Sequence, residues 1–574
     1  MNPILGIHDG HNAAAIVLDR GRVIAGVQEE RLTRVKNQGG LPRQAIEDAL
    51  SMSGIASADL AKVALNGLYM TYDHWERDPL SETYEKSGGF ITRLKQPLKG
   101  TFVDDLYQKS KAQERFRQLA DAGIKNGLLS PVVHHTAHAA AAYYGSGWKG
   151  KVLVLTCDGA GDRLSGSVSI AEKGSIEQIA SIPENDSIGH LYSMVTYCMG
   201  MMPLEHEYKV MGLAPYVGDT AKAEQQAALF ADLFEFDPKN PMLWRRRSGV
   251  PPMHSAYGFV RKLLYRQRFD LVAAGLQKFI EDMLIQWVRN CVRETGIRRI
   301  ACSGGVFMNV KANKEILALP EVDELFVFPS CGDETNSVGA AYWTYAQHRL
   351  QSSEPVDIEP LGNIYWGRDF SDAEVENALT RFKGQNKLCF EPAQDIERLA
   401  AETIARGEVV ARAKGRMEFG ARSLGNRAIL ARADSMEAVR VINDMIKNRD
   451  FWMPFAPAVL AERANDYYLK PKPMDAPYMI IAFDSRPETR HKYPAGQHPY
   501  DHSVRPQEVS PTSNPDFYRL IKSYEEITGE GIILNTSFNL HGYPIVYKPE
   551  EALDVLDRSG LKYLALGNWW VWKN

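Results

Sequence analysis

Three histidines lie within five positions in the stretch 132–147, which reads VVHHTAHAAAAYYGSG. The alanines that follow are strong helix formers, so we expect a helix that begins near His134. On such a helix His134 and His138 are one turn apart on the same face, whereas His135 points about 100° away. Two imidazoles at this spacing can bind one metal ion, and the same spacing fits a polar helix cap equally well.

Two glycine-containing junctions follow in the region 298–341. The first reads RRIACSGGVFMNVKAN and the second reads VFPSCGDETNSVGAA. Each pattern predicts a strand, then a glycine turn, then a helix. Glycine lets backbone amides approach a ligand closely, and the amino end of a helix favours anions. Two such junctions in tandem indicate a nucleotide-binding cleft.

Cations, glycines and hydroxyls are interleaved in the last third of the chain. The stretch 411–432 reads ARAKGRMEFGARSLGNRAILAR, and two further cations precede the segment DFWMPFAPAVLAE. The stretch 531–546, GIILNTSFNLHGYPIV, ends a predicted strand in a polar turn. Such residues bind multiply charged phosphates. A solvated basic face is the alternative, and the interleaved apolar positions argue against it.

The elements that would position these residues form a repeated pattern. Residues 4–30 predict a strand followed by a hairpin, and 151–182 predict the same arrangement, with a strand that ends in Asp158. We therefore expect a duplicated α/β fold with a cleft between its halves. Residues 270–289 predict a buried amphipathic helix. The Pro-, Ser- and Glu-containing stretch 348–364 predicts a linker between domains at 1–350 and 351–574.

Composition argues against several classes of protein, among them nucleic-acid-binding, disulfide-rich and membrane proteins. The chain has 574 residues, 44% of them hydrophobic, and a formal net charge of -4, which does not favour a nucleic-acid partner. The six cysteines form no CxxC pair, which argues against zinc fingers and a disulfide framework. The amino terminus lacks the basic region of a signal peptide, and no apolar run approaches the ~18 residues of a membrane span. We expect a cytoplasmic protein with no membrane partner.

The chain resembles the NodU/CmcH family of O-carbamoyltransferases, which includes enzymes of antibiotic biosynthesis and of nodulation-factor decoration. The segments that carry the resemblance occur in family order over nearly the whole chain: HDGHNAAAIV, EERLTR, HHTAH, DGAGD, EYKVMGLAPY, SGGVFMN, CGDETNSVGAA, KGRMEFGARSLGNRAIL, IKNRDFWMPFAP and LNTSFNLHGYPIV. The resemblance implies an amino-terminal domain of the actin/hexokinase/heat-shock ATPase class, which has an RNase H-like fold, and a carboxy-terminal YrdC-like α/β domain.

The resemblance also implies a reaction. The second domain would form carbamoyladenylate from carbamoyl phosphate and ATP, with Mg²⁺ on the triphosphate. The first would transfer the carbamoyl group to a hydroxyl of a small molecule beside a metal, usually Fe²⁺, with Zn²⁺ or Mn²⁺ as alternatives. A homodimer is the oligomeric state that the family suggests. The acceptor is not specified by the sequence, and segments 66–130 and 217–267 are expected to shape its pocket.

Site residues follow from the resemblance by position. The metal ligands would be His134, His138, Asp158 and Asp333. His11 would be the catalytic base, a role for which a poised imidazole suits neutral pH, and His8 is the alternative. The adenylate would contact Lys209, Gly304, Gly305 and Asn309. Carbamoyl phosphate and ATP would be held by Arg416, Lys447, Arg449, Arg505, Asn535 and Ser537.

The chain departs from the family pattern at Lys414, where glutamine is common, and at Met453, where arginine is usual. Both departures concern the anion contacts.

Three other functions compete with carbamoyl transfer to a small molecule. A tRNA-modifying or hydrogenase-maturation enzyme would call for a basic surface or for CxxC fingers, which the chain lacks. A sugar kinase of the same fold class would not need the HxxxH pair and two aspartates, and a non-catalytic nucleotide-binding partner protein would not need His11.

Overall fold

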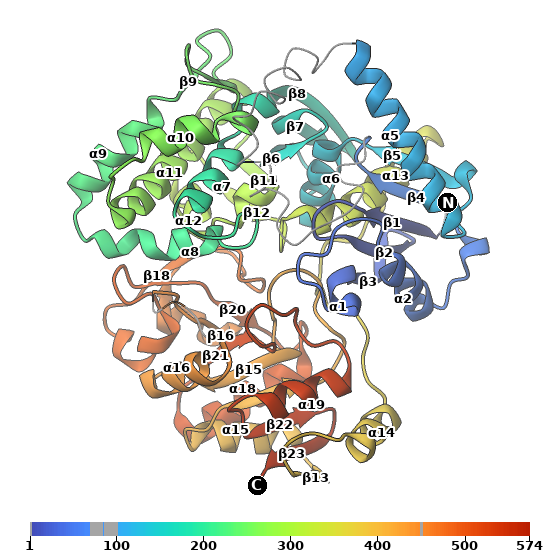
Figure 1. Cartoon of the computed structure of the whole chain (residues 1–574), viewed down its shortest axis with the longest axis vertical. Helices are drawn as coiled ribbons and strands as arrows, with labels where there is room; N and C mark the ends of the chain where they lie inside the picture. Colours follow the sequence, from blue (N-terminus) through green and yellow to red (C-terminus); the bar gives the residue numbers. More distant parts are fainter. Residues whose placement is uncertain (1–2, 69–83, 85–101, 448–449, 451) are drawn as a thin grey trace. The chain divides into compact units, whose positions relative to one another are not determined.

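The computed structural model describes residues 3–68, 84, 102–447, 450 and 452–574 (Figure 1). It divides into two compact units. The N-terminal unit comprises Met1–Glu29 and Asn37–Leu361, and the C-terminal unit comprises Glu30–Lys36 and Gly362–Asn574. Among the described residues, no helix combines the length and the apolar composition that a membrane span requires.

The division between the units differs from the expected one between residues 350 and 351. Residues beyond 350 stay with the N-terminal unit because their backbone is bonded to it: the Glu359 amide donates to Gly21 and the Leu361 amide to Gly145. Residues 30–36, which include all of the EERLTR motif except Glu29, belong instead to the C-terminal unit. There Arg31 donates to the Gly420 carbonyl at 2.7 Å, and Arg34 donates to the Ile545 carbonyl at 2.7 Å.

The N-terminal unit contains two five-stranded sheets with the same strand order. The first sheet runs β3(Arg22–Gln28), β2(Ala14–Asp19), β1(Ile4–His8), β4(Lys62–Asn66), β5(Leu129–Val132), and the second runs β8(Ser175–Pro183), β7(Leu164–Glu172), β6(Val152–Gly161), β11(Arg299–Ser303), β12(Glu324–Val327). In each sheet an antiparallel hairpin is followed by two parallel strands. This confirms the duplicated RNase H-like α/β fold.

Two helices of small residues pack against each other and against the two sheets. Helix α13(Asn336–Gln351) contacts strands of the first sheet, and α6(His134–Ser146) contacts strands of the second. The helices approach so closely that a Cβ on Gly339 would lie 1.9 Å from the Ala137 carbonyl oxygen. The alanine run of α6 is therefore buried between sheet and helix, which explains its composition.

Further helices surround these sheets. Helix α11(Phe269–Thr295) matches the amphipathic helix expected over 270–289, and its apolar stripe is buried. Within the described part of the unit the other helices are α2(Arg43–Ser53), α5(Phe102–Asp121), α7(Ile188–Cys198), α8(Glu207–Leu213), α9(Thr220–Ala231), α10(Tyr257–Leu263) and α12(Val310–Ala318). A short helix α1(Glu29–Thr33) begins the EERLTR segment, and β9(Phe234–Phe236) pairs with β10(Trp244–Arg246).

The C-terminal unit is an α/β domain around an eight-stranded sheet. In spatial order its strands are β13(Leu388–Pro392), β23(Trp569–Lys573), β22(Tyr563–Leu566), β14(Val410–Ala413), β15(Arg427–Arg432), β21(Ile532–Ser537), β16(Ala456–Leu460) and β20(Gln507–Val509). Helices α15(Ile396–Ala405) and α18(Pro515–Thr528) share a hydrophobic core with it. The other elements are α14(Asp372–Arg381), α16(Met436–Ile442), α17(Ala464–Tyr467), α19(Pro549–Arg558), β17(Tyr468–Leu469), β18(Phe483–Ser485) and β19(Ser503–Val504).

Candidate metal centre

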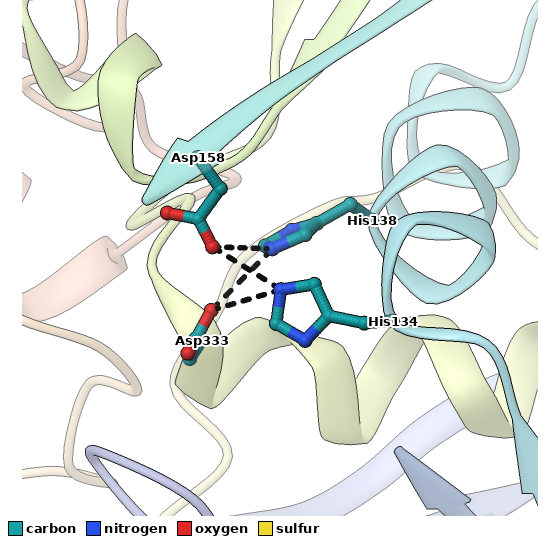
Figure 2. Close-up of side chains that lie close together, drawn as sticks. All are labelled: His134, His138, Asp158 and Asp333. Atoms are coloured by element: carbon teal, nitrogen blue, oxygen red, sulfur yellow. Dashed lines mark hydrogen bonds and ion pairs between the residues drawn. The ribbon is translucent and has the colours of Figure 1, made fainter. Parts of the chain in front are cut away.

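Four side chains of the N-terminal unit converge on one point (Figure 2). His134 and His138 project from successive turns of α6. Asp158 lies near the carboxyl end of β6, and Asp333 begins the short helical turn Asp333–Thr335 that leads into α13. One ligand atom from each of the four side chains lies within 4.8 Å of all the others. The structure thus brings together the four residues expected to bind the metal.

The spacing of the four groups suits a metal ion. His134 Nε2 lies 3.1 Å from Asp158 Oδ2 and 3.4 Å from Asp333 Oδ1. His138 Nε2 lies 3.5 Å and 3.4 Å from the same two oxygens. Four ligands placed tetrahedrally at about 2.1 Å from an ion are about 3.4 Å apart. The four nitrogen–oxygen distances therefore match the separation of ligands in a tetrahedral site. The nitrogen–nitrogen and oxygen–oxygen pairs lie within 4.8 Å.

The two carboxylates of the site favour the cationic form of the His134 imidazole. Burial lowers the pKa of His134, but Asp333 and Asp158 outweigh it and raise the pKa to about 9. Burial also opposes ionisation of Asp158, yet hydrogen bonds with His134 and His138 keep its pKa well below its usual range. Two carboxylates thus create a negative field that a proton or a metal cation can neutralise.

Neighbouring groups orient the ligands. His138 Nδ1 lies 3.1 Å from the Ser303 hydroxyl, which can accept its proton and leave the Nε2 lone pair for a metal. The amide of Gly305 donates to Asp158 Oδ1 at 3.2 Å, so the first glycine junction contacts the cluster directly. Gly304 has φ +110°, and a Cβ there would lie 2.3 Å from the Cys157 carbonyl oxygen. Only glycine fits this approach.

Asp162 fixes the start of α6 and was not found from the sequence, although it ends the DGAGD segment. Its carboxylate accepts from the His134 amide at 2.8 Å and from the Leu68 amide at 3.0 Å. Replacing Asp162 with alanine is expected to lower the free energy of unfolding by about 1–2 kcal/mol, the usual cost of losing a helix cap. Urea unfolding of the full chain checks this, with Asp219→Ala, which removes the side-chain cap of α9, as the reference for the size of such a loss. Unchanged stability in Asp162→Ala would show that the cap is dispensable.

His135 takes no part in the cluster. Its Nδ1 lies 2.8 Å from the Thr156 hydroxyl, which in turn bonds to Ser167 at 2.7 Å. Burial, together with the nearby charges of His134 and His138, lowers the pKa of His135 to about 3, so this imidazole is neutral. The structure therefore places His135 in the framework between α6 and the second sheet.

His8 and His11 lie at the first hairpin. His11 is half-buried in the turn between β1 and β2, and its carbonyl oxygen accepts from His8 Nε2 at 2.8 Å. His8 Nδ1 accepts from the Asn66 amide at 2.9 Å, and its Nε2 is 3.9 Å from Asp333 Oδ2. Burial lowers the pKa of His8 to about 4, even against the charge of Asp333. His8 is thus neutral with both nitrogens engaged, which makes it a poor candidate for the base.

An ion pair buried beneath this hairpin was also missed by sequence analysis. Arg115 Nε donates to Asp9 Oδ2 at 2.6 Å, and Arg115 Nη1 donates to the Gly67 carbonyl at 2.7 Å. Arg115 also donates to the Asn66 carbonyl. These contacts join α5 to β4 and to the residue that follows β1, which are far apart in the chain, so no local motif could have predicted them.

The residues expected to contact adenylate lie around the second sheet. Gly304 and Gly305 follow β11, and Lys209 lies in α8. Asn309 caps α12 by accepting from the Ala312 amide at 3.1 Å, and its amide donates to Gln277 at 2.9 Å. The structure brings Gly305 to the metal cluster and assigns Asn309 to helix capping.

The residues expected to bind carbamoyl phosphate and ATP gather along one edge of the C-terminal sheet. Arg416 follows β14, Ser537 ends β21, and Arg505 precedes β20, while β16 begins at the same edge. The Arg416 side chain reaches the Gly367 carbonyl at 3.0 Å. Lys447 ends the helical turn Asn443–Lys447, which precedes β16, and Arg449 lies outside the described residues.

Two further side chains of this unit have protein partners close to the same edge. The Asn535 amide donates to the Ser423 carbonyl at 3.1 Å and to Gln507 Oε1 at 2.8 Å, so this side chain joins three segments at the sheet edge. Lys414 bonds to Glu397 at 2.7 Å and lies 3.3 Å from Asp516. The positive charge of Lys414, where the family commonly has glutamine, is therefore neutralised by two neighbouring carboxylates.

Sequence analysis also missed the residue that closes the glycine-rich loop after β14. Glu418 is buried, and its Oε1 accepts from the Leu424 amide at 2.6 Å and from the Arg427 amide at 3.3 Å. In the sequence, the position of Glu418 within the KGRMEFG segment is the feature that could have indicated its role.

The chain thus combines a repeated RNase H-like sheet pair, a His–His–Asp–Asp cluster and a separate α/β unit. Family models described as "Carbamoyltransferase N-terminus" and "Carbamoyltransferase C-terminus" match residues 3–342 and 401–573. The chain belongs to the carbamoyltransferase family and is a carbamoyltransferase. This confirms the resemblance drawn from its motifs.

The chain is also similar to two nodulation proteins and to one solved structure. Nodulation protein NolNO of Sinorhizobium fredii is 32% identical, over 98% of this chain and 79% of its own. Nodulation protein NolO of Bradyrhizobium diazoefficiens is 32% identical, over 77% of this chain and 78% of its own. The crystal structure of T. kodakarensis HypF is 13% identical and has a TM-score of 0.32, over 61% of this chain and 48% of HypF.

Proposed function

We propose that the protein is an ATP-dependent O-carbamoyltransferase that acts in two stages. The C-terminal unit forms carbamoyladenylate from carbamoyl phosphate and ATP. The N-terminal unit then transfers the carbamoyl group to a hydroxyl of a small molecule, a sugar or a secondary metabolite. The observation that carries the proposal is the His134–His138–Asp158–Asp333 cluster, with the Gly304–Gly305 junction hydrogen-bonded to it.

The donor set supports a divalent transition ion at this cluster. Two imidazoles with two carboxylates suit Fe²⁺, Mn²⁺ or Zn²⁺. His134 and His138 would offer their Nε2 atoms, and Asp158 and Asp333 one oxygen each. A bound ion would supply positive charge that stabilises the adenylate phosphate as AMP leaves. The glycine junction would place backbone amides beside the same phosphate.

His11 would act as the general base in this transfer. Its imidazole would take the proton of the acceptor hydroxyl as the oxygen attacks the carbamoyl carbon, and the bond to the AMP phosphate oxygen would break. His8, which donates to the His11 carbonyl, would hold the turn in place.

The first stage consumes water and releases two products besides the adenylate. Carbamoyl phosphate loses its phosphate to give carbamate, whose oxygen attacks the α-phosphorus of ATP and displaces pyrophosphate. Both substrates are polyanions, so the reaction needs cations and Mg²⁺ to offset their charge. Arg416, Arg505 and Ser537 at the sheet edge, with Lys447 and Arg449, are the proposed contacts. The position of Arg416, Arg505 and Ser537 at the same edge of the sheet supports a common binding site for the two substrates.

Replacing Arg416 with alanine is expected to slow ATP-dependent pyrophosphate release by roughly 10- to 100-fold, because the polyanion loses charge-assisted hydrogen bonds of about 1.5–3 kcal/mol. Pyrophosphate is measured with carbamoyl phosphate and ATP at fixed Mg²⁺. Arg440→Ala is the matched control, because this exposed arginine lies on α16 and pairs only weakly with Glu437 at 3.5 Å.

The same assay tests the division of labour between the units. Metal content should be unchanged in Arg416→Ala, because the cluster lies in the N-terminal unit. If Arg416→Ala releases pyrophosphate normally but transfers no carbamoyl group, the assignment of the first stage to the C-terminal unit is wrong.

A further inference from the structure

Asn336 lies beside the metal-facing nitrogen of His138. It is the first residue of α13, three positions after Asp333, and it is fully buried. Its amide nitrogen is 3.0 Å from His138 Nε2, closer than either carboxylate oxygen is to that atom. Among the described residues, its carbonyl oxygen Oδ1 has no hydrogen-bond partner.

The contact between Asn336 and His138 cannot persist when a cation is bound. A metal on His138 Nε2 uses the lone pair that the amide N–H would need. The buried side chain has no solvent to turn to. Its two polar atoms are nearly equal in size, so half a turn of the carboxamide exchanges nitrogen for oxygen without moving the backbone. The oxygen would then face the cation, and the amide nitrogen would take the place that Oδ1 occupies now.

We infer that the Asn336 carboxamide oxygen is a fifth ligand of the metal at the His134–His138–Asp158–Asp333 cluster. This rests on the metal site of the proposed function. Its place fits the helix geometry, because residues at i and i+3 on a helical turn share a face, as Asp333 and Asn336 do. A 3.0 Å separation from His138 Nε2 also equals the distance between adjacent ligands at right angles about 2.1 Å from an ion.

A fifth oxygen ligand changes which metal the site prefers. Zn²⁺ is satisfied by four tetrahedral ligands, whereas Mn²⁺ and Fe²⁺ suit larger shells rich in oxygen. With Asn336 the protein would provide two nitrogens and three oxygens. The site would therefore favour Mn²⁺ or Fe²⁺ more than the four-residue cluster alone would.

The test compares metal binding by the full chain and its variants, without any activity assay. Asn336→Leu keeps the side-chain volume but has no ligand atom, and Asn336→Asp keeps an oxygen. Ser337→Ala is the matched control, since Ser337 is buried on the same turn and its hydroxyl donates to the Glu334 carbonyl. The metal-free proteins are titrated with Mn²⁺ and with Zn²⁺, and Co²⁺ absorption reports the coordination number.

We expect Asn336→Leu to weaken Mn²⁺ binding by at least roughly tenfold, with a much smaller change for Zn²⁺. Asn336→Asp and Ser337→Ala should keep Mn²⁺ affinity, and the Co²⁺ bands should intensify in Asn336→Leu as the shell contracts to four ligands. If Asn336→Leu does not fold, Asn336→Ala takes its place.

Three outcomes would overturn the inference: unchanged Mn²⁺ affinity in Asn336→Leu, equal losses for Mn²⁺ and Zn²⁺, or an intense four-coordinate Co²⁺ spectrum in the wild type. Failure of the wild type to bind any of these metals would instead refute the metal site of the proposed function. The two failures are therefore distinguishable.

Discussion

His138→Ala is expected to empty the metal site. The wild type should carry about one equivalent of a transition metal, because the described residues contain one four-ligand cluster. The His138 imidazole lies 3.4–3.5 Å from both carboxylates, so its removal takes away one ligand of the ion. It also removes a hydrogen-bonding partner that offsets the negative charge of Asp158 and Asp333. Loss of a group that only orients a ligand costs 10–100-fold in metal affinity, so loss of the ligand itself should exceed roughly 100-fold. Metal content by elemental analysis and affinity by titration measure this.

His135→Ala is the matched control for His138→Ala. Both histidines are buried on α6, but His135 contacts Thr156 and lies outside the cluster. The His135 variant should lose thermal stability, because a cavity forms and Thr156 loses a partner, yet it should retain the metal. Equal metal loss in the two variants would contradict the assignment of His134 and His138 as the ligand pair.

His11→Ala is expected to separate the two stages of the reaction. Carbamoyladenylate should still form, because that chemistry is assigned to the other unit. Transfer to the hydroxyl should fall by roughly 10²–10⁴-fold, the usual contribution of a positioned base. Because the adenylate reacts with water, the stalled enzyme should hold bound adenylate or slowly release AMP. AMP and carbamoylated product are followed in parallel with any acceptor that the wild type uses.

His8→Gln is the comparison for His11→Ala. His8 already uses Nε2 on the His11 carbonyl and Nδ1 on Asn66, and glutamine can replace one of these bonds. Its transfer rate should fall less than that of His11→Ala. Full product formation by His11→Ala would exclude the base role of His11, and a larger loss in His8→Gln would assign that role to His8.

The sequence by itself determined the local parts of this protein. The alanine run after His138 predicted α6, and its 3.6-residue period separated His134 and His138 from His135. The two strand–hairpin patterns predicted the duplicated sheets, because alternation and turn residues act over short distances. Ten motifs in order predicted the carbamoyltransferase family.

Tertiary structure decided what distant segments do together. Asp158 and Asp333 were expected at the metal only by resemblance, and folding of β6 and α13 beside α6 places them there. The assignment of residues 30–36 to the C-terminal unit depends on carbonyls of Gly420 and Ile545, which no local pattern encodes. Lys414, Asn535 and Asn336 likewise took their roles from partners far along the chain. The sequence gives the chemical type of each side chain, but its burial and its partners arise only when the segments pack. Burial and partners decide whether a lysine, an amide or an imidazole stabilises the fold or binds a ligand.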